Sequence, residues 1–205
     1  MNYFVTAIGT DSGKTLIASA LALALDADYW KPIQAGYPTD SDTVRTLTAG
    51  KIQIHKESYV LRTPASPHYA AAVDNINIDS SNFKIPETQN SVVIEGAGGC
   101  LVPINNSEFV IDLAQEFKAE VILVSNNYLG SINHTLLTLD YLYNNNFNVK
   151  AIIFNGLTNE STEDIIMKNC KAPCFYKVAV LKEVNQATVE ALAKEFKLRW
   201  NELGW

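Results

Sequence analysis

Short apolar runs alternate along this chain with longer stretches in which apolar residues lie three or four positions apart. The short runs are rich in β-branched and aromatic residues, a composition typical of β-strands. The longer stretches have the spacing of helices with one apolar face. We expect strands at residues 3–6, 28–30, 91–95, 120–125, 149–154 and 175–180. We expect helices at residues 14–25, 41–49, 109–117, 132–143, 162–168 and 186–199.

Three of the expected strands, at residues 92–94, 121–124 and 151–154, are continuously apolar rather than alternating. Strands of this kind are covered on both faces, as the central strands of parallel sheets are. The pattern therefore predicts an α/β protein with a doubly wound, mostly parallel sheet flanked by helices. The polar stretch at residues 74–90 is expected to be a surface connection with a short helix. No internal repeat and no linker rich in Pro or Ser divides the chain, so we expect residues 1–205 to form a single domain.

Composition and charge exclude several classes of protein. The 205 residues are 47% apolar and 19% charged, which excludes disorder, collagen-like repeats and coiled coil. Sixteen Lys and Arg against 22 Asp and Glu give a net charge of −6, which argues against nonspecific binding to nucleic acid or to an anionic membrane. The longest apolar run, residues 16–25, is about half of the roughly 20 residues that a membrane helix needs.

The first residues resemble no secretory or transit leader, and we expect a cytoplasmic protein. The three cysteines form no CxxC pair, so neither a disulfide framework nor a zinc site is expected.

The strongest motif directly follows the first expected strand. Residues 7–15 read AIGTDSGKT and lead into a helix that begins at Lys14 or Thr15, the arrangement of a variant phosphate-binding loop. Small residues let successive backbone amides surround phosphate oxygens, while Lys14 reaches the β- and γ-phosphates and the Thr15 hydroxyl binds Mg²⁺. A GKT sequence also occurs by chance, but its position between a strand and an amphipathic helix favours the functional interpretation. The loop has one residue more than the common form, and it lacks the upstream lysine of the partition and septum-positioning ATPases.

Two further strand ends carry charged residues. Lys31 follows the second strand, and ligands of open α/β sheets bind outside the carboxyl ends of the strands. A lysine there can neutralise charge on a transferring phosphoryl group, and an ordinary solvated lysine is an equally good interpretation. Glu95 ends another strand before a run of small residues, and with Asp42 it would supply the carboxylates that Mg²⁺ prefers. Asp42 lies at a helix start that either Asp40 or Ser41 can cap.

Three other segments are weaker candidates. A helix is expected to begin at Pro67, and the adjacent His68 is a ligand, a base or only a polar neighbour. The segment at residues 129–134 begins a helix after a central strand and offers backbone amides to an anion. Asn155, followed by Gly156, is either part of a plain turn or an amide that reads a base.

Together these motifs resemble the dethiobiotin synthetase family. The similarity runs from Tyr3 to about Leu181 and rests on FVTAIGTDSGKT, YWKPIQAG, the SDT that contains Asp42, TPASPH, VVIEGAGG and LGSINHTLLT, followed by Asn155-Gly156. The resemblance implies a P-loop NTPase-like fold, a homodimer and Mg²⁺ as cofactor. It also implies ATP-dependent carboxylation and ring closure of 7,8-diaminononanoate with CO₂ to dethiobiotin, ADP and phosphate, through a carbamate and a carbamic-phosphoric anhydride.

The resemblance also assigns roles to individual residues. It places Thr10, Lys14 and Lys31 around the reacting carbamate and the γ-phosphate, and it makes Thr15, Asp42 and Glu95 the magnesium ligands. The nucleotide-binding residues that it implies are Asp11, Ser12, Gly13, Lys14, Thr15, Leu16, Asp42, Glu95, Gly96, Ala97, Gly98, Asn155, Gly156, Ala179, Val180 and Leu181. The substrate-binding residues that it implies are Ala35 together with Gly130, Ser131 and Asn133 of the other subunit.

Three residues depart from the family's pattern. Ala7 stands where many members have Gly, Ala35 where many have a Ser or Thr hydroxyl near the substrate, and Ala179 where Pro is frequent. The contact of the missing hydroxyl is therefore absent or taken over by Gln34, and selectivity for the nucleotide base is left open.

Two other functions are consistent with the same fold. A partition-type ATPase would use the nucleotide as a switch for binding a partner, but the missing upstream lysine and the presence of Lys31 argue against it. An amide-forming ligase of the cobyrinate type that lacks its glutaminase domain is a closer alternative, and analysis of the product separates the two enzymes.

Overall fold

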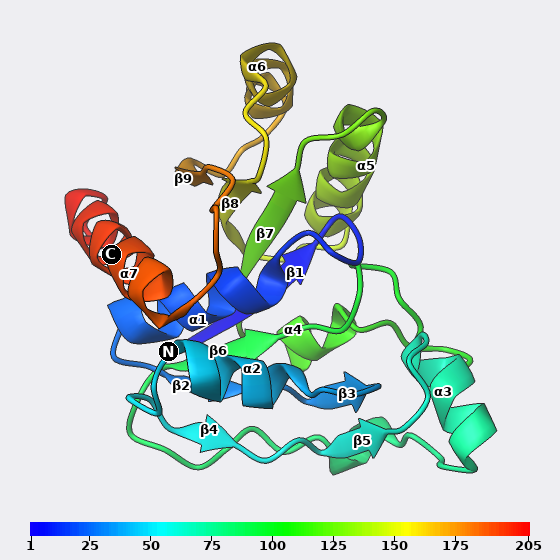
Figure 1. Ribbon diagram of the computed structural model, residues 1–205. Helices are drawn as coiled ribbons and strands as arrows, with labels where there is room; N and C mark the ends of the chain where they lie inside the picture. Colours follow the sequence, from blue (N-terminus) through cyan, green and yellow to red (C-terminus); the bar gives the residue numbers. More distant parts are fainter.

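The computed structural model describes residues 1–205 and centres on a seven-stranded sheet in which neighbouring strands all run parallel (Figure 1). The strand order is β4-β2-β6-β1-β7-β8-β9, with β1 in the middle of the sheet. The strands are β1 (Asn2–Ala7), β2 (Asp28–Trp30), β4 (Ile54–His55), β6 (Val92–Glu95), β7 (Glu120–Asn126), β8 (Val149–Asn155) and β9 (Cys174–Val178). The predicted doubly wound parallel sheet is thereby confirmed.

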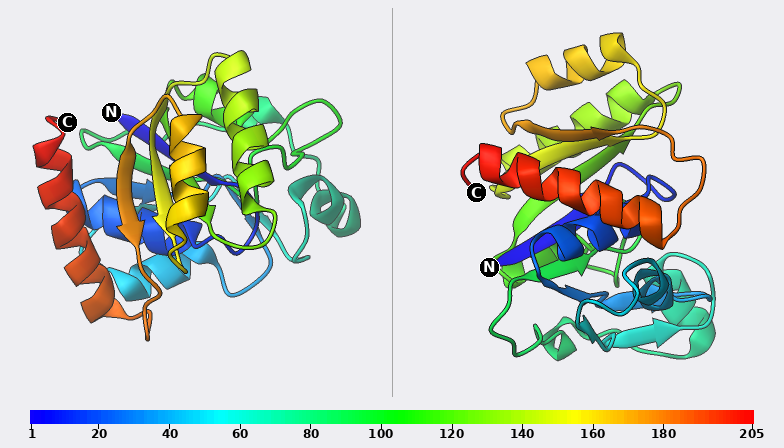
Figure 2. Two further views of the ribbon diagram at one scale, coloured as in Figure 1. Left: turned by 90° about the horizontal axis from the view of Figure 1, so that it is seen from above. Right: turned by 60° about the vertical axis from the view of Figure 1, so that its left-hand side comes forward.

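Helices cover both faces of this sheet. They are α1 (Lys14–Ala24), α2 (Asp40–Leu47), α3 (Pro67–Asp74), α4 (Asp112–Glu116), α5 (Ser131–Asn144), α6 (Glu160–Lys168) and α7 (Gln186–Glu202), with a 3₁₀ helix, η1 (Ser80–Asn82), in the expected polar connection. Figure 2 shows α7 beside α1 on one side of the sheet and α5 and α6 on the other. None of the helices combines the length and the apolar character that crossing a membrane requires.

The apolar strands form a core on each side of the sheet. Successive side chains of a strand point to opposite faces, so Val5 packs in the cluster that includes α1 and α7, whereas Phe4 packs in the cluster that includes α3 and α4. A smaller cluster joins Leu123 and Ile152 of the sheet to α5 and α6. Burial on both faces explains why these strands are continuously apolar in sequence.

The sequence pattern missed three short strands. Besides β4 at the sheet edge, β3 (Ile33–Ala35) and β5 (Tyr59–Leu61) pair in parallel as a separate two-stranded sheet. Each of these strands has only two or three residues, which is too short for a periodic pattern to appear. The last predicted strand is also shorter than expected, because its pairing with β8 ends at Val178.

Two helix starts differ from the expected ones. α2 begins at Asp40 and its cap is Thr39, whose hydroxyl accepts a hydrogen bond from the Asp42 amide at 3.0 Å. The expected caps, Asp40 and Ser41, were therefore wrong. α4 begins at Asp112 rather than at residue 109, because Phe109 forms an antiparallel bridge with Pro103.

Candidate active site

The loop between β1 and α1 is a tight turn that depends on small residues. Gly13, immediately before α1, has a left-handed φ of 88°, and a Cβ at this position would lie 2.1 Å from the Asn155 Nδ2 atom. Both constraints require glycine. The Ser12 hydroxyl and the Lys14 Nζ each donate to the Gly9 carbonyl, at 3.2 Å and 3.1 Å, so the loop curls around its own lysine.

Lys31 lies at the carboxyl end of β2 and is a buried ion-pair partner, not a solvated lysine. Its side chain is 4% exposed, and its Nζ lies 2.6 Å from Asp40 Oδ2 and 3.1 Å from Glu95 Oε1. It also donates to the Gly96 carbonyl at 3.1 Å. Burial alone would lower the pKa of Lys31, but the carboxylates of Glu95 and Asp40 outweigh burial and raise it. Lys31 therefore carries a positive charge in the folded protein.

Glu95 connects the phosphate-binding loop with β2. It ends β6, is 1% exposed, and accepts hydrogen bonds from the Thr15 hydroxyl at 2.9 Å and from the Tyr29 hydroxyl at 2.8 Å. Burial raises the pKa of Tyr29 well above its ordinary value, and the Glu95 charge acts in the same direction. Burial lowers the pKa of Lys14 to about 8, although the Glu95 carboxylate opposes this shift. Two lysines and one carboxylate thus meet where β1, β2 and β6 end.

A cavity of about 680 Å³ opens over these groups. Besides the lysines, its walls come from the 33–40 segment after β2 and from the 64–67 segment before α3. Of the residues expected in the site, those that line it are Thr10, Asp11, Gly13, Lys14, Thr15, Lys31, Ala35, Glu95, Ala97 and Gly98. The structure therefore brings the expected phosphate and metal groups together, with the exception of Asp42.

Asp42 lies outside this cavity. Its side chain is exposed and accepts a hydrogen bond from the Thr39 hydroxyl at 2.7 Å, next to the cap of α2. Asp40 instead lines the cavity and pairs with Lys31. The sequence interpretation considered Asp40 only as a cap, and residues two apart on a helix face different directions. Which of the two carboxylates reaches Lys31 depends on where α2 begins, and the motif alone carries no signal for that.

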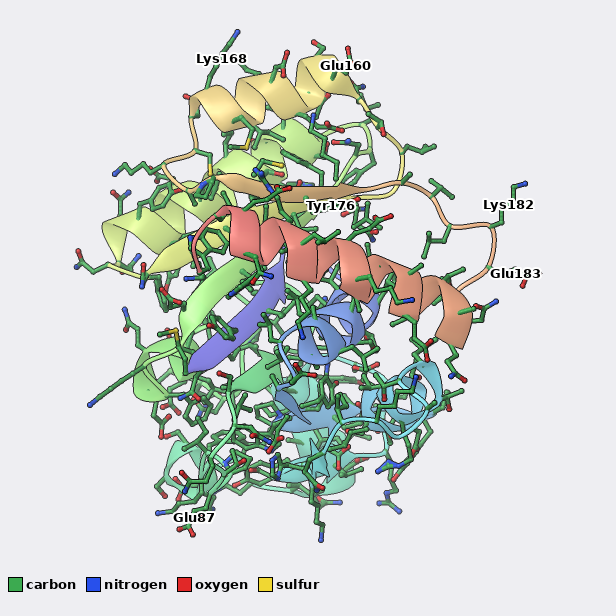
Figure 3. All side chains as sticks on the ribbon, turned by 90° about the vertical axis from the view of Figure 1, so that its left-hand side faces the viewer. Glu87, Glu160, Lys168, Tyr176, Lys182 and Glu183 are labelled. Carbon is green, nitrogen blue, oxygen red and sulfur yellow. The ribbon has the colours of Figure 1, made fainter.

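Asn155 and its neighbours form a second group at the same edge of the sheet. Asn155 ends β8, and its Nδ2 donates to the Ser12 carbonyl at 2.9 Å, so it touches the phosphate-binding loop. Gly156 donates to the Val178 carbonyl at 2.8 Å. Ala179 and Val180 are exposed after β9, and the link to α7 projects from the molecule with Lys182 and Glu183 at its tip (Figure 3). The residues of the nucleotide set that do not line the cavity are Ser12, Leu16, Asp42, Gly96, Asn155, Gly156, Ala179, Val180 and Leu181.

The start of α5 lies apart from the cavity of the same chain. Gly130, Ser131 and Asn133 do not line it, and Leu129 beside them is fully exposed. The Ser131 hydroxyl is buried and has no hydrogen-bond partner. A second cavity of about 360 Å³ lies between the phosphate-binding loop and α5, lined by residues that include Gly9, Cys100 and Leu137. His68 is exposed and outside the main cavity, although Ser66 and Pro67 line it.

This sheet, with a glycine-rich loop that leads from its central strand into α1 and a lysine at the helix start, is that of a P-loop NTPase. A family model described as an AAA domain matches residues 1–188. A septum site-determining protein from Pyrococcus horikoshii that was solved with Mg-ADP matches 98% of this chain and 96% of its own, with a TM-score of 0.55 and 12% identity. The chain is also similar in fold to a putative plasmid partition protein from Borrelia burgdorferi bound to AMPPNP, with a TM-score of 0.57, 11% identity and coverage of 97% of this chain and 98% of that one. At these identities the likeness concerns the fold alone.

Sequence relatives define the family more narrowly. An ATP-dependent dethiobiotin synthetase from Cytophaga hutchinsonii is 49% identical over 98% of this chain and 98% of its own. Another from Christiangramia forsetii is 42% identical over 98% and 99%, and one from Chlamydia pneumoniae is 36% identical over 96% and 89%. The chain therefore belongs to the family of ATP-dependent dethiobiotin synthetases, and it is an ATP-dependent ligase of biotin biosynthesis.

Proposed function

We propose that the chain joins 7,8-diaminononanoate, CO₂ and ATP at the cavity over β1, β2 and β6, forming dethiobiotin, ADP and phosphate. The observation that carries this proposal is the convergence of Lys14, Lys31 and Glu95 on one cavity next to a phosphate-binding loop. Two fixed positive charges suit a reaction in which an anionic carbamate must approach an anionic γ-phosphate.

One amine of the substrate first adds to CO₂ and loses a proton, which gives the carbamate. The two steps that follow require positioning more than protein nucleophiles. A carbamate oxygen forms a bond to the γ-phosphorus while the bond from that phosphorus to the bridging oxygen breaks, and ADP leaves. The second amine then attacks the carbamate carbon, its proton is lost, and phosphate leaves as the ring closes. In this scheme Lys14 holds the β- and γ-phosphates, and Lys31 and Thr10 hold the oxygens of the reacting carbamate and γ-phosphate. The absence of a Ser-His-Asp arrangement from the site is consistent with this chemistry.

The residues around Glu95 fit a magnesium ion. Mg²⁺ is bound in proteins by one or two carboxylates together with substrate phosphates, and the Thr15 hydroxyl and Glu95 carboxylate offer hard oxygen donors 2.9 Å apart beside the loop. The bound ion would neutralise charge on the triphosphate. Thr15 and Glu95 would hold it, and the sequence-based prediction adds Asp42, which would have to give up its hydrogen bond with Thr39.

Asn155 is proposed to read the base of the nucleotide. Its amide lies against the phosphate-binding loop and has a carbonyl oxygen for the exocyclic amino group of adenine. The backbone at residues 179–181 would cover the base from the β9 side. The sugar and base would then extend from the phosphates along the ends of β8 and β9.

We also propose a homodimer in which α5 of one subunit completes the substrate pocket of the other. Leu101, Leu129 and Leu137 are exposed apolar residues near the start of α5, and isolated monomers seldom leave such groups uncovered together. The helix N-terminus of α5 and the unpartnered Ser131 hydroxyl suit a carboxylate. A two-fold interface would form both pockets at once.

The use of ATP is consistent with a cytoplasmic enzyme.

The test is a reconstituted reaction with the purified protein. Incubation with 7,8-diaminononanoate, carbon-13 bicarbonate, ATP and Mg²⁺ should yield dethiobiotin with the label in its ureido carbonyl, and one phosphate per ring. ATP hydrolysis that needs no diamine would indicate the partition-type switch. A product that contains an amide formed from added ammonia would indicate the amide ligase, and either result would overturn the proposal.

A further inference from the structure

Glu163 is a buried carboxylate that lies outside the cavity. It belongs to the first turn of α6, and its side chain is 1% exposed. A buried charge is tolerated in a protein only when partners satisfy it. Burial alone would raise the pKa of Glu163, but hydrogen bonds from Lys177, Asn159 and Asn127 outweigh burial and lower it. Glu163 is therefore a charged carboxylate whose position is set by these three residues.

These donors come from β9 and from the segments that follow β7 and β8. Lys177 of β9 lies 2.7 Å from Glu163 Oε2. Asn127, directly after β7, donates from Nδ2 to Oε1 at 2.8 Å, and the Asn159 amide in the β8–α6 link donates to the same oxygen at 3.0 Å. One side chain thus ties the ends of β7, β8 and β9 together.

The same group of contacts reaches the segment that carries Asn155. Asn127 Nδ2 also donates to the Leu157 carbonyl at 2.8 Å, two residues after Asn155. Asn155 in turn donates to the Ser12 carbonyl at 2.9 Å. The segment at residues 155–159 is therefore held at one end by the phosphate-binding loop and at the other by Asn127 and Glu163.

We infer that Glu163 is a positioning residue for selection of the nucleotide base, because its bonds to Asn127, Asn159 and Lys177 set the position of the 155–159 segment and hence of the Asn155 amide. The inference rests on the proposed role of Asn155. Charge-assisted hydrogen bonds are shorter and stronger than neutral ones, so they can hold an amide in the narrow geometry that distinguishes adenine from hypoxanthine.

The experiment compares Glu163→Gln with the unmodified chain in the dethiobiotin-forming reaction. Glutamine keeps the shape but loses the ion pair with Lys177, so we expect the kcat/KM preference for ATP over ITP to fall about tenfold, or ~1.4 kcal/mol. The kcat at saturating ATP should stay the same. Inhibition by tripolyphosphate, which occupies the phosphate-binding loop and has no base, should also be unchanged.

Matched variants separate this effect from general loosening of the helix. Glu160→Gln, an exposed residue of the same helix turn, should leave the ATP preference unchanged. Lys177→Met should reduce it to the same extent as Glu163→Gln, and the double variant should show little further loss. The Lys177 side chain is 47% exposed, so Lys177→Met is expected to fold. It therefore tests the same ion pair if Glu163→Gln does not fold.

Asn155→Ala distinguishes the two ways in which the inference can fail. If Asn155→Ala leaves the ratio of ATP to ITP unchanged, Asn155 does not read the base, and both that proposed contact and the role of Glu163 are overturned. If Asn155→Ala lowers the ratio but Glu163→Gln and Lys177→Met do not, the proposed function stands and the positioning role alone is overturned. Weaker tripolyphosphate inhibition in Glu163→Gln would also overturn it, because the change would then concern the phosphates.

Discussion

At the scale of single residues, Glu95 combines a structural role with the proposed role of a magnesium ligand. Its two oxygens accept from the Tyr29 and Thr15 hydroxyls and from Lys31, and all of these contacts are buried or half-buried. These three donors fix the orientation of the Glu95 carboxylate beside the phosphate-binding loop. A change at Glu95 is therefore expected to affect both folding and the proposed metal binding.

Glu95→Gln should weaken both properties. We expect the Mg²⁺ concentration for half-maximal activity to rise about tenfold or more, because a neutral amide is a poorer ligand for this hard ion. The free energy of unfolding should fall by about 1–3 kcal/mol, because the Tyr29 and Lys31 donors lose a charged acceptor. Activity titrations with Mg²⁺ and urea denaturation measure the two effects. An unchanged Mg²⁺ titration would remove Glu95 from the metal ligands.

Lys31→Ala should lower kcat by about 10²–10³, the usual cost of losing one preorganised charge at a reacting centre. ATP binding, measured by calorimetry, should weaken much less than turnover falls. Lys51→Ala is the matched control, because Lys51 is exposed, pairs with Glu190, and does not line the cavity. Near-normal ring closure by a folded Lys31→Ala protein would contradict the role given to Lys31.

At the scale of elements, the edge of the sheet depends on a buried carboxylate. Asp28 begins β2 and is 3% exposed, and its oxygens contact His55 Nε2 of β4 at 2.8 Å and Asn90 Nδ2 at 2.9 Å. Burial alone would raise the pKa of Asp28, but hydrogen bonds from Asn90, His55 and Thr88 outweigh it and hold the pKa below its usual value. These bonds join β2 to β4 and to the connection before β6.

The depressed pKa of Asp28 predicts the pH dependence of stability. The unfolded chain binds this proton more tightly than the folded one, so the contribution of Asp28 is present above pH ~4 and is lost as pH falls through the folded pKa. Asp28→Asn should therefore cost about 1–3 kcal/mol at pH 7. Urea denaturation of both proteins at pH 7 and at pH 3 should show this difference shrinking in acid. A difference that is equal at both pH values would mean that the charge of Asp28 is not involved.

At the scale of the whole molecule, the position of the start of α5 gives its residues no contact with the cavity of their own chain. Its residues lie outside the cavity, and Leu129 is exposed along its full side chain. A second copy that covers this surface would bring the α5 amides of one subunit to the cavity of the other. The proposed dimer therefore predicts pockets made of two halves.

Mixing two impaired variants, assayed at a diamine concentration where neither is active alone, tests these shared pockets. Asn133→Asp should raise the KM for the diamine by placing a negative charge beside its carboxylate, while ATP binding stays nearly intact. Refolded together with Lys31→Ala, it should recover roughly one quarter of wild-type activity, because half of the dimers are mixed and each has one intact pocket. No recovery, or a fully active monomer in sedimentation at the assay concentration, would contradict the shared pocket.

The sequence alone determined the parts of this protein that depend on local order. The buried strands follow from continuously apolar runs, and the loop before α1 follows from Gly13 and Lys14 at the end of the first strand. The family follows from the order of several motifs, each of which is readable without knowing any contact. These features depend on neighbours in the chain, and local chemistry is sufficient to predict them.

Which distant side chains meet depends on how the elements pack against one another. The tertiary structure paired β3 with β5, placed Asp40 rather than Asp42 against Lys31, and joined Glu163 to Asn127 and Lys177. Each of these contacts depends on the register of one element against another, and a shift of one or two residues would direct a different side chain to the same place. Distances across such packed elements are not encoded in any short stretch of the chain, which is why the motifs located the site but did not resolve its charge network.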